Sequence, residues 1–275
     1  MTSGIGSLMR LVGSLAVFLV LPVEAAASDS QLAVGSAKTQ SNAALQAHFR
    51  GVYRNETLDT QEWRGEETFD LWLHADGSRT LNVLTNLAAR SALFDVNLRS
   101  DAQFNPLEAF VRYWNQGVYK GSGHFWVEGH QLQITSAGPL GRQSDSLAVP
   151  ASWSMGSHPV SADGWHTARF DPTGEPVQTV SLLSIDASAD VSKPVSGRFV
   201  PLKIEFIGEE TLEVPAGRFV TQHYRLAGLN DIWVTEPHRI VIKSEIPVRN
   251  LRYVLTEWVS AGSGMVMSDE VESRR

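Results

Sequence analysis

The stretch TFDLWLHADGSRTLNVLT, residues 68–85, indicates the fold class of this chain. Large apolar side chains stand at every second position on both sides of a central break: Phe69, Leu71 and Leu73, then Leu81 and Val83. A period of two is typical of a strand that buries one face. Asp76-Gly77 lies in the break and suits a tight turn between two strands. The stretch therefore predicts a β-hairpin.

The same alternation recurs along most of the chain. Its segments are residues 92–101, 124–136, 201–214, 218–226, 231–235, 239–246 and 252–258. Residues 107–120 are rich in Phe, Val, Tyr and Trp, which favours strand over helix. Short strands separated by turn residues, without amphipathic helices between them, predict an antiparallel all-β domain over residues 45–260. A short helix is expected only over residues 43–49, and a long irregular stretch is expected before the strand segment that begins at residue 201.

The two ends of the chain carry no strand pattern. Residues 1–27 have one arginine, a short apolar run and a small-residue site, which is the layout of a secretory signal cleaved after Ala27. We expect a flexible leader over 28–44 and a disordered tail over 261–275. No cysteine follows the apolar run, so no lipid attachment is expected. The resulting prediction is a periplasmic protein without an integral membrane anchor. An uncleaved membrane anchor is the alternative, although the run is short for a span.

Composition narrows the classes of partner. The chain has 275 residues, a net charge of −7 and no clustered basic segment, which argues against nucleic acid as a partner. The complete absence of cysteine excludes disulfides, a thiol nucleophile and a thiolate metal site. The standard phosphate, dinucleotide and hydrolase motifs are missing too, so no cofactor is expected. The pattern does not indicate an oligomeric state.

Residues 208–245 contain the turn VPAGRF followed by the strand segments 223–226, 231–234 and 239–243. Pro215 suits the first corner of the turn and Gly217 its left-handed position. In this region the chain resembles a family of uncharacterised exported bacterial proteins that share a VPAG-x-F hairpin. The resemblance implies a curved antiparallel sheet, an unclosed barrel similar to the lipoprotein-localisation factors, whose concave face holds apolar molecules. It carries over no catalytic residue.

The segment SHPVSADGWHTARFD, residues 157–171, is the densest group of chemically active side chains. A carboxylate that reaches one ring nitrogen of a histidine prepares the other nitrogen to take a proton. His158, Asp163 and His166 are therefore the candidate catalytic residues if the protein is an enzyme. Pro159 and Gly164 predict an irregular loop, and the competing interpretation is that this loop simply packs Trp165 on the sheet. Histidine spacing elsewhere does not match a metal site, so no metal is expected.

A second group of candidates is aromatic and basic, and it lies mainly in residues 112–126. We interpret it as the possible entrance of a pocket for an apolar molecule with an acidic group. The candidate ligand-binding residues are Trp72, Tyr113, Trp114, Tyr119, Lys120, His124, Trp126, Arg142 and Trp165. Because side chains alternate between the two faces of a strand, only some of them can share one face. Core aromatics and solvated basic stems are the competing interpretation.

Three hypotheses for function remain from different classes. The first is a binding protein for a lipophilic or aromatic small molecule, held on the concave face of a sheet. The second is a cofactor-independent lyase, isomerase or dehydratase that acts on such a molecule through a His–Asp pair. The third is a structural envelope protein without a small ligand. The second gains over the first if His158, Asp163 and His166 line a buried pocket together with His124 or Arg142.

Overall fold

The computed structural model describes residues 45–261. The predicted signal peptide over 1–27, the leader over 28–44 and the tail from residue 262 onward lie outside the described residues. None of the described helices is long and apolar enough to cross a membrane.

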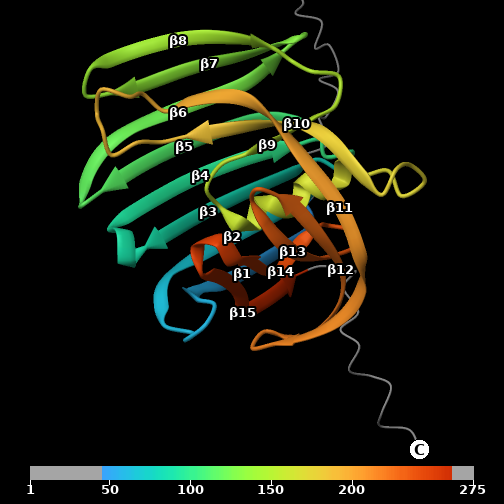
Figure 1. Ribbon diagram of the computed structural model, residues 1–275. Coiled ribbons are helices and arrows are strands. Elements are labelled where there is room, and N and C mark those ends of the chain that lie inside the picture. Colours follow the sequence, from blue (N-terminus) through green and yellow to red (C-terminus); the bar gives the residue numbers. More distant parts are fainter. Residues whose placement is uncertain (1–44, 262–275) are drawn as a thin grey trace, which may run out of the picture. The chain divides into compact units, whose positions relative to one another are not determined.

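The described residues form a single sheet of fifteen strands (Figure 1). In spatial order the strands are β8 (Gly141–Ala148), β7 (Gln131–Gly138), β6 (Val118–Glu128), β5 (Pro106–Asn115), β4 (Ala92–Ser100), β3 (Arg79–Leu87), β2 (Trp63–His74), β1 (Leu45–Thr57), β15 (Leu251–Ala261), β14 (Ile240–Ile246), β13 (Asn230–Thr235), β12 (Gly217–Ala227), β11 (Ser196–Val214), β10 (Val177–Asp186) and β9 (Trp153–Gly156).

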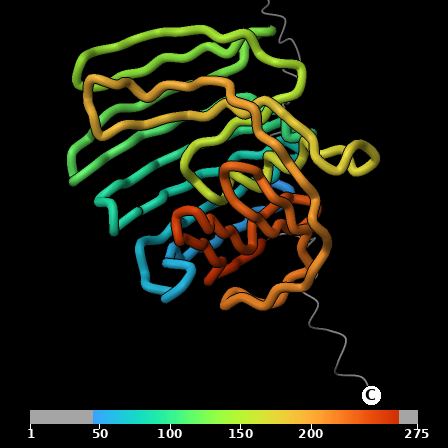
Figure 2. Tube along the Cα trace, viewed as in Figure 1, coloured from blue at the N-terminus to red at the C-terminus, as the bar shows by residue number. Residues whose placement is uncertain are grey.

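The sheet is strongly curved and does not close into a barrel. Its end strands are β8 and β9, and neither pairs with the other. All neighbours are antiparallel except β9 and β10, which pair in parallel. The long orange strand β11 pairs with β10 along its first part and with β12 along its second (Figures 1 and 2). The predicted fold class, an all-β curved sheet forming an unclosed barrel, is confirmed.

The hairpins follow from the alternation of side chains. In β2 and β3 every second residue is buried, and Phe69 pairs with Val83 across the strands. Residues 107–120 also form strands, as predicted, with the turn of the β5–β6 hairpin at Gln116-Gly117. The VPAG-x-F segment forms the β11–β12 hairpin, in which Val214 pairs with Gly217 and Gly217 has a φ of 135°. A positive φ at this position favours glycine.

The expected short helix over residues 43–49 is wrong for the described residues of that range. Residues 45–49 are the first part of β1, which pairs with β2 on one side and β15 on the other. Ala47 and Phe49 are buried and the residues around them are more exposed. Pairing on both sides, together with this period of two, outweighs the helical propensity of alanine and leucine.

The segment around residues 157–171 is also more regular than expected. Val160–Arg169 forms a ten-residue 3-10 helix, η2, and the preceding Pro159 is its first flanking residue. Gly164 does not break this helix. A Cβ atom added to Gly164 would lie 2.0 Å from the backbone oxygen of Arg239, so glycine is required for close packing. Strands β9 and β10 on either side of η2 lie in the stretch that was expected to be irregular.

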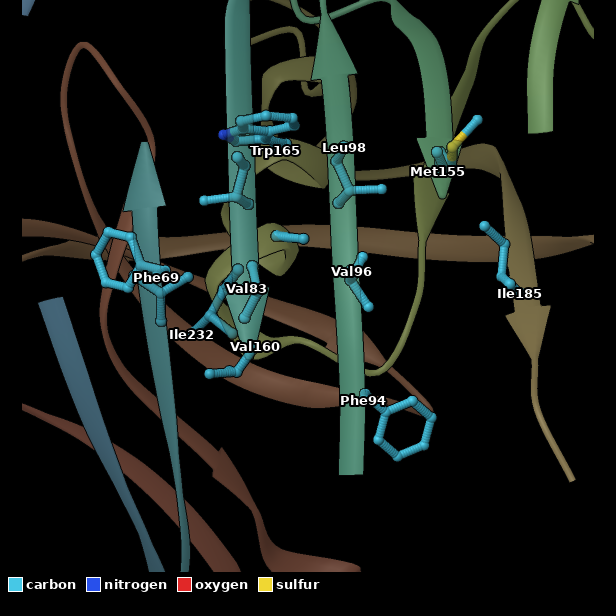
Figure 3. Close-up of a cluster of buried hydrophobic side chains, with 14 of the residues drawn as sticks. Phe69, Val83, Phe94, Val96, Leu98, Met155, Val160, Trp165, Ile185 and Ile232 are labelled. Atoms are coloured by element: carbon cyan, nitrogen blue, oxygen red, sulfur yellow. The ribbon is translucent and has the colours of Figure 1, made fainter. Parts of the chain in front are cut away.

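Helix η2 packs inside the curve of the sheet. It contacts β9, β13 and β14. Figure 3 shows its residues Val160 and Trp165 beside the inward-facing side chains of β3 and β4, among them Val83 and Val96. The interpretation that this segment packs Trp165 on the sheet is therefore correct for the position of Trp165. The helix thus occupies part of the concave face, and the side chains of the strands make up most of the core.

Candidate ligand-binding cavity

A cavity of about 310 Å³ lies inside the curved sheet, next to the first part of η2. Its wall includes the start of η2, the end of β10 and three connections between strands. These connections are the β3–β4 turn, the β12–β13 turn at Gly228-Leu229 and the β14–β15 turn. The volume is at the lower end of the range for small-molecule sites in proteins.

Much of the cavity wall is apolar. The apolar side chains include Leu87, Phe94, Val160, Leu182, Ile185 and Leu229. Tyr113 and Tyr253, both buried, add aromatic surface, and the ring of Tyr113 lies 4.6 Å from that of Phe94. Burial raises the pKa of Tyr253 well above its ordinary value, so this tyrosine stays neutral. The wall can therefore hold the apolar part of a small molecule.

The exposed side of the cavity carries three arginines, Arg64, Arg90 and Arg249. Arg64 is half-buried, whereas Arg90 and Arg249 are exposed. Within residues 45–261, none of the three forms an ion pair with a carboxylate, although seven other arginines do. Arginine guanidinium groups bind carboxylates and phosphates with two parallel hydrogen bonds. The three side chains are therefore available to pair with an anion.

Two of these arginines come from turns of the same design. Ala88–Arg90 (η1) joins β3 to β4, and Pro247–Arg249 (η3) joins β14 to β15. Each turn is a three-residue 3-10 helix that ends in arginine and is followed by a left-handed residue, Ser91 or Asn250. The curvature of the sheet brings both turns to one cavity.

His158 lies beside this basic edge, and its ring stacks on Phe94 at 4.5 Å. Burial, together with the smaller effect of the charges of Arg90 and Arg249, lowers the pKa of His158 to about 4. The ring is therefore neutral at physiological pH and can accept as well as donate a hydrogen bond. Its Nδ1 atom is buried and has no hydrogen-bond partner among the described residues.

The deeper wall contains a connected group of polar side chains. Asp163 Oδ2 accepts a hydrogen bond from Asn230 Nδ2 at 2.7 Å, and Asp163 Oδ1 lies 3.6 Å from His166 Nε2. On its other side, His166 Nδ1 lies 2.6 Å from Ser154 Oγ. The imidazole is thus placed between a hydroxyl and a carboxylate. His166 and Ser154 are almost fully buried, which makes Asp163 the more accessible member.

Glu67 anchors this polar wall from behind. Its carboxylate accepts hydrogen bonds from the backbone nitrogens of Val160 and Ser161, at 3.0 and 2.8 Å, and from Thr85 Oγ1 at 2.9 Å. Glu67 is fully buried, and burial raises its pKa to about 7 against the lowering effect of these hydrogen bonds. The contacts fix the first turn of η2, which lies between two residues of the cavity wall, His158 before the helix and Asp163 within it.

No protein-family model matches the chain, and no curated protein matches it. The solved structures that are similar to it include the following two. One is a beta-barrel-like protein of the domain of unknown function DUF1849 from Brucella abortus, 11% identical, with a TM-score of 0.47 over 79% of this chain and 100% of that one. The other is a DUF1089 family protein from Pseudomonas aeruginosa, 15% identical, with a TM-score of 0.41 over 65% of this chain and 89% of that one.

Four of the residues predicted from the sequence line the cavity. They are the three candidate catalytic residues, His158, Asp163 and His166, and the aromatic candidate Tyr113. Their roles in binding or catalysis stay predictions. The two residues that would have favoured an enzyme, His124 and Arg142, do not line this cavity.

The remaining candidates lie elsewhere. Trp165 is buried on η2 against Phe104, with ring centroids 6.1 Å apart. The others belong to β2, β6, β8 and the outward-facing part of β5 and do not line the cavity: Trp72, Trp114, Tyr119, Lys120, His124, Trp126 and Arg142. Trp72 stacks on His48, and His124 stacks on Trp126 while its Nε2 lies 2.8 Å from Glu108. The structure separates this aromatic group from the polar segment of η2.

Sequence reasoning missed the three arginines and Asn230. A signal for two of them is present in the chain, because AARS (88–91) and PVRN (247–250) both place arginine before a residue that tolerates a left-handed backbone. Nothing in a linear sequence shows that these two turns meet. Within residues 45–261 no cluster of three His, Asp or Glu side chains is arranged to hold a metal.

Proposed function

We propose that this protein binds a small amphipathic molecule that carries an anionic group. The apolar part lies on the wall formed by Phe94, Leu182 and Ile185, and the anion pairs with Arg90 and Arg249. The observation that carries the proposal is the set of arginines without carboxylate partners at the exposed side of a cavity whose wall is apolar in part. The sequence predicts a lipophilic or aromatic ligand, and this proposal adds that the ligand has a charged end.

Electrostatics support an anion rather than a cation at this edge. The cavity wall contains three arginines and only two carboxylates, Asp163 and Asp186. Asp186 is exposed and already lies 3.6 Å from Arg198. The neutral ring of His158 adds no charge of its own. An anion at this edge is therefore attracted, and a cation is repelled.

Calorimetric titration with decanoate and with decanol tests the proposal, because the two probes differ only in the charged end. We expect decanoate to bind and decanol to bind at least about tenfold more weakly, since hydrogen bonds to charged groups are worth the corresponding free energy. The affinity of the protein for decanoate should fall as the salt concentration rises, because salt screens the exposed arginines.

The double variant Arg90→Gln with Arg249→Gln should bring the affinity for decanoate close to that for decanol. Arg218→Gln is the matched control, because Arg218 is exposed at the start of β12, outside the cavity. Equal binding of both probes by the unmodified protein, or no loss in the double variant, would refute the proposal.

A second candidate function is acid–base catalysis on the bound molecule, as a lyase, isomerase or dehydratase. The observation that favours it is the contact of Asp163 with His166 and the presence of the neutral His158 in the same wall. Mass spectrometry of a bound molecule after incubation in heavy water tests it. Deuterium incorporation or product formation that is lost in His158→Gln supports catalysis, and an unchanged mass refutes it.

We also propose that the chain acts after export to the periplasm, which rests on the layout of residues 1–27. Cell fractionation, with and without these residues, tests the location.

A further inference from the structure

We propose that the ligand carries a hydrogen-bond donor, a hydroxyl or an amine, at the end opposite its anionic group, and that Asp163 and Asn230 accept this donor. This inference rests on the proposed function and specifies the class of ligand. The molecule would be a carboxylate or other acid with an apolar middle and a polar far end.

The first acceptor is the side-chain oxygen of Asn230. The amide nitrogen of Asn230 donates to Asp163 Oδ2 at 2.7 Å and to Ser244 Oγ at 2.8 Å, so both of its hydrogens are used. The amide orientation follows from these contacts, because a carboxylate oxygen needs a donor. Asn230 Oδ1 has no partner within the described residues, although the residue is only 6% exposed and lines the cavity. A buried polar atom without a partner is uncommon in folded proteins.

The second acceptor is the other oxygen of Asp163. Asp163 Oδ1 lies 3.6 Å from His166 Nε2, which is too far for a good hydrogen bond. Its Oδ2 atom is already held by Asn230. Within residues 45–261 no other side chain donates to Oδ1. Both residues line the cavity, and each has one side-chain oxygen without a close hydrogen-bond donor: Asp163 Oδ1 and the buried Asn230 Oδ1.

These acceptors and the arginines lie at different depths. Arg90 and Arg249 are exposed, whereas Asp163 and Asn230 are largely buried. The negative charge of Asp163 disfavours a second acidic group at the deep end, and the unpaired acceptors disfavour a purely apolar one. A molecule with an acid at one end and a donor at the other satisfies both ends of the cavity.

Calorimetric titration with decanoate and ω-hydroxydecanoate tests the inference. We expect the hydroxylated acid to bind about tenfold more tightly to the unmodified protein, because its hydroxyl satisfies a charged acceptor. ω-Aminodecanoate distinguishes an amine from a hydroxyl as the preferred donor.

Asp163→Asn is the informative variant, because its oxygen can still accept from Asn230 while its amide nitrogen replaces the free acceptor. We expect the ratio of the dissociation constants of decanoate and ω-hydroxydecanoate to fall to about one, because one hydrogen bond to a charged group is lost. Asp145→Ala, on β8 and outside the cavity, is the control and should keep the ratio. If Asp163→Asn does not fold, Asn230→Ala, which removes the other acceptor, is expected to reduce the same ratio.

The outcomes separate the two proposals. Equal binding of decanoate and both ω-substituted acids by the unmodified protein overturns this inference and leaves the proposed function standing. An unchanged ratio in a folded Asp163→Asn variant also overturns it. Failure of every carboxylate to bind overturns the proposed function itself.

Discussion

Glu67 is a buried carboxyl group whose ionisation should affect the stability of the whole protein. Its pKa is raised by burial from 4.5 to about 7. Below pH 4.5 the group is protonated in both the folded and the unfolded state. As the pH rises from 4.5 to 7, the unfolded state loses this proton first, so the free energy of unfolding falls by about 1.4 kcal/mol per pH unit.

The Glu67→Gln variant removes this contribution, although it also weakens the contacts to η2 at every pH. Chemical denaturation of both proteins between pH 4.5 and pH 8 checks the prediction. Relative to Glu67→Gln, the free energy of unfolding of the wild-type protein should fall by about 3 kcal/mol as the pH rises to 7, and it should fall no further above pH 7. Parallel stability curves for the two proteins would show that Glu67 has an ordinary pKa.

Gly164 should be sensitive even to alanine. The added Cβ atom would lie 2.0 Å from the backbone oxygen of Arg239, so η2 or the β13–β14 turn must shift. Strain of this kind costs about 1–3 kcal/mol. Gly208→Ala is the control, because a Cβ atom there meets nothing within 4 Å, and we expect a change of at most about 0.5 kcal/mol. Equal effects of the two substitutions on denaturation midpoints would contradict the packing described for Gly164.

At the scale of residues, the sequence predicts which side chains can do chemistry better than it predicts where they lie in the fold. His158, Asp163 and His166 stand close together in the chain, so their meeting in one wall was open to prediction. Arg90 and Arg249 are separated by most of the chain and meet only because the sheet curves. The outward aromatics were predicted as ligand-binding residues because one sequence does not show which face of a strand is concave.

At the scale of elements, η2 is the main support of the cavity. Trp165 is its largest side chain and is only 7% exposed. We expect Trp165→Ala to lower the free energy of unfolding by about 3 kcal/mol or more. Trp63→Ala should cost less than about 1 kcal/mol, because Trp63 is 48% exposed. Thermal and chemical denaturation check both, and similar losses would mean that η2 is not a packed part of the core.

The elements differ in how far they could be predicted. The hairpins β2–β3 and β6–β7 carry alternation and turn residues in neighbouring segments, so the local pattern contains all the information needed. Helix η2 has Pro159 and Gly164 near or within it, which predicts a loop. Its regularity comes from tertiary contacts, namely the acceptors of Glu67 at its first turn and the close approach of Arg239 at Gly164.

At the scale of the whole molecule, the curved sheet and η2 leave one polar-edged space. The sheet alone would form an open trough, and η2 packs inside it. What remains is bounded by turns that carry Arg90 and Arg249 and by the polar end of η2. A ligand that binds only this folded arrangement should also stabilise it, in proportion to its concentration over its dissociation constant.

The most direct test of the account is native mass spectrometry of the protein incubated with a bacterial small-molecule extract and then dialysed. We expect a retained species that denaturing extraction identifies as an amphipathic acid. We also expect that the double variant Arg90→Gln with Arg249→Gln retains none of it, while Arg218→Gln retains it fully. A bare protein, or a neutral or cationic molecule retained equally by the double variant, would contradict the central claim that the arginines make this cavity an anion-selective site.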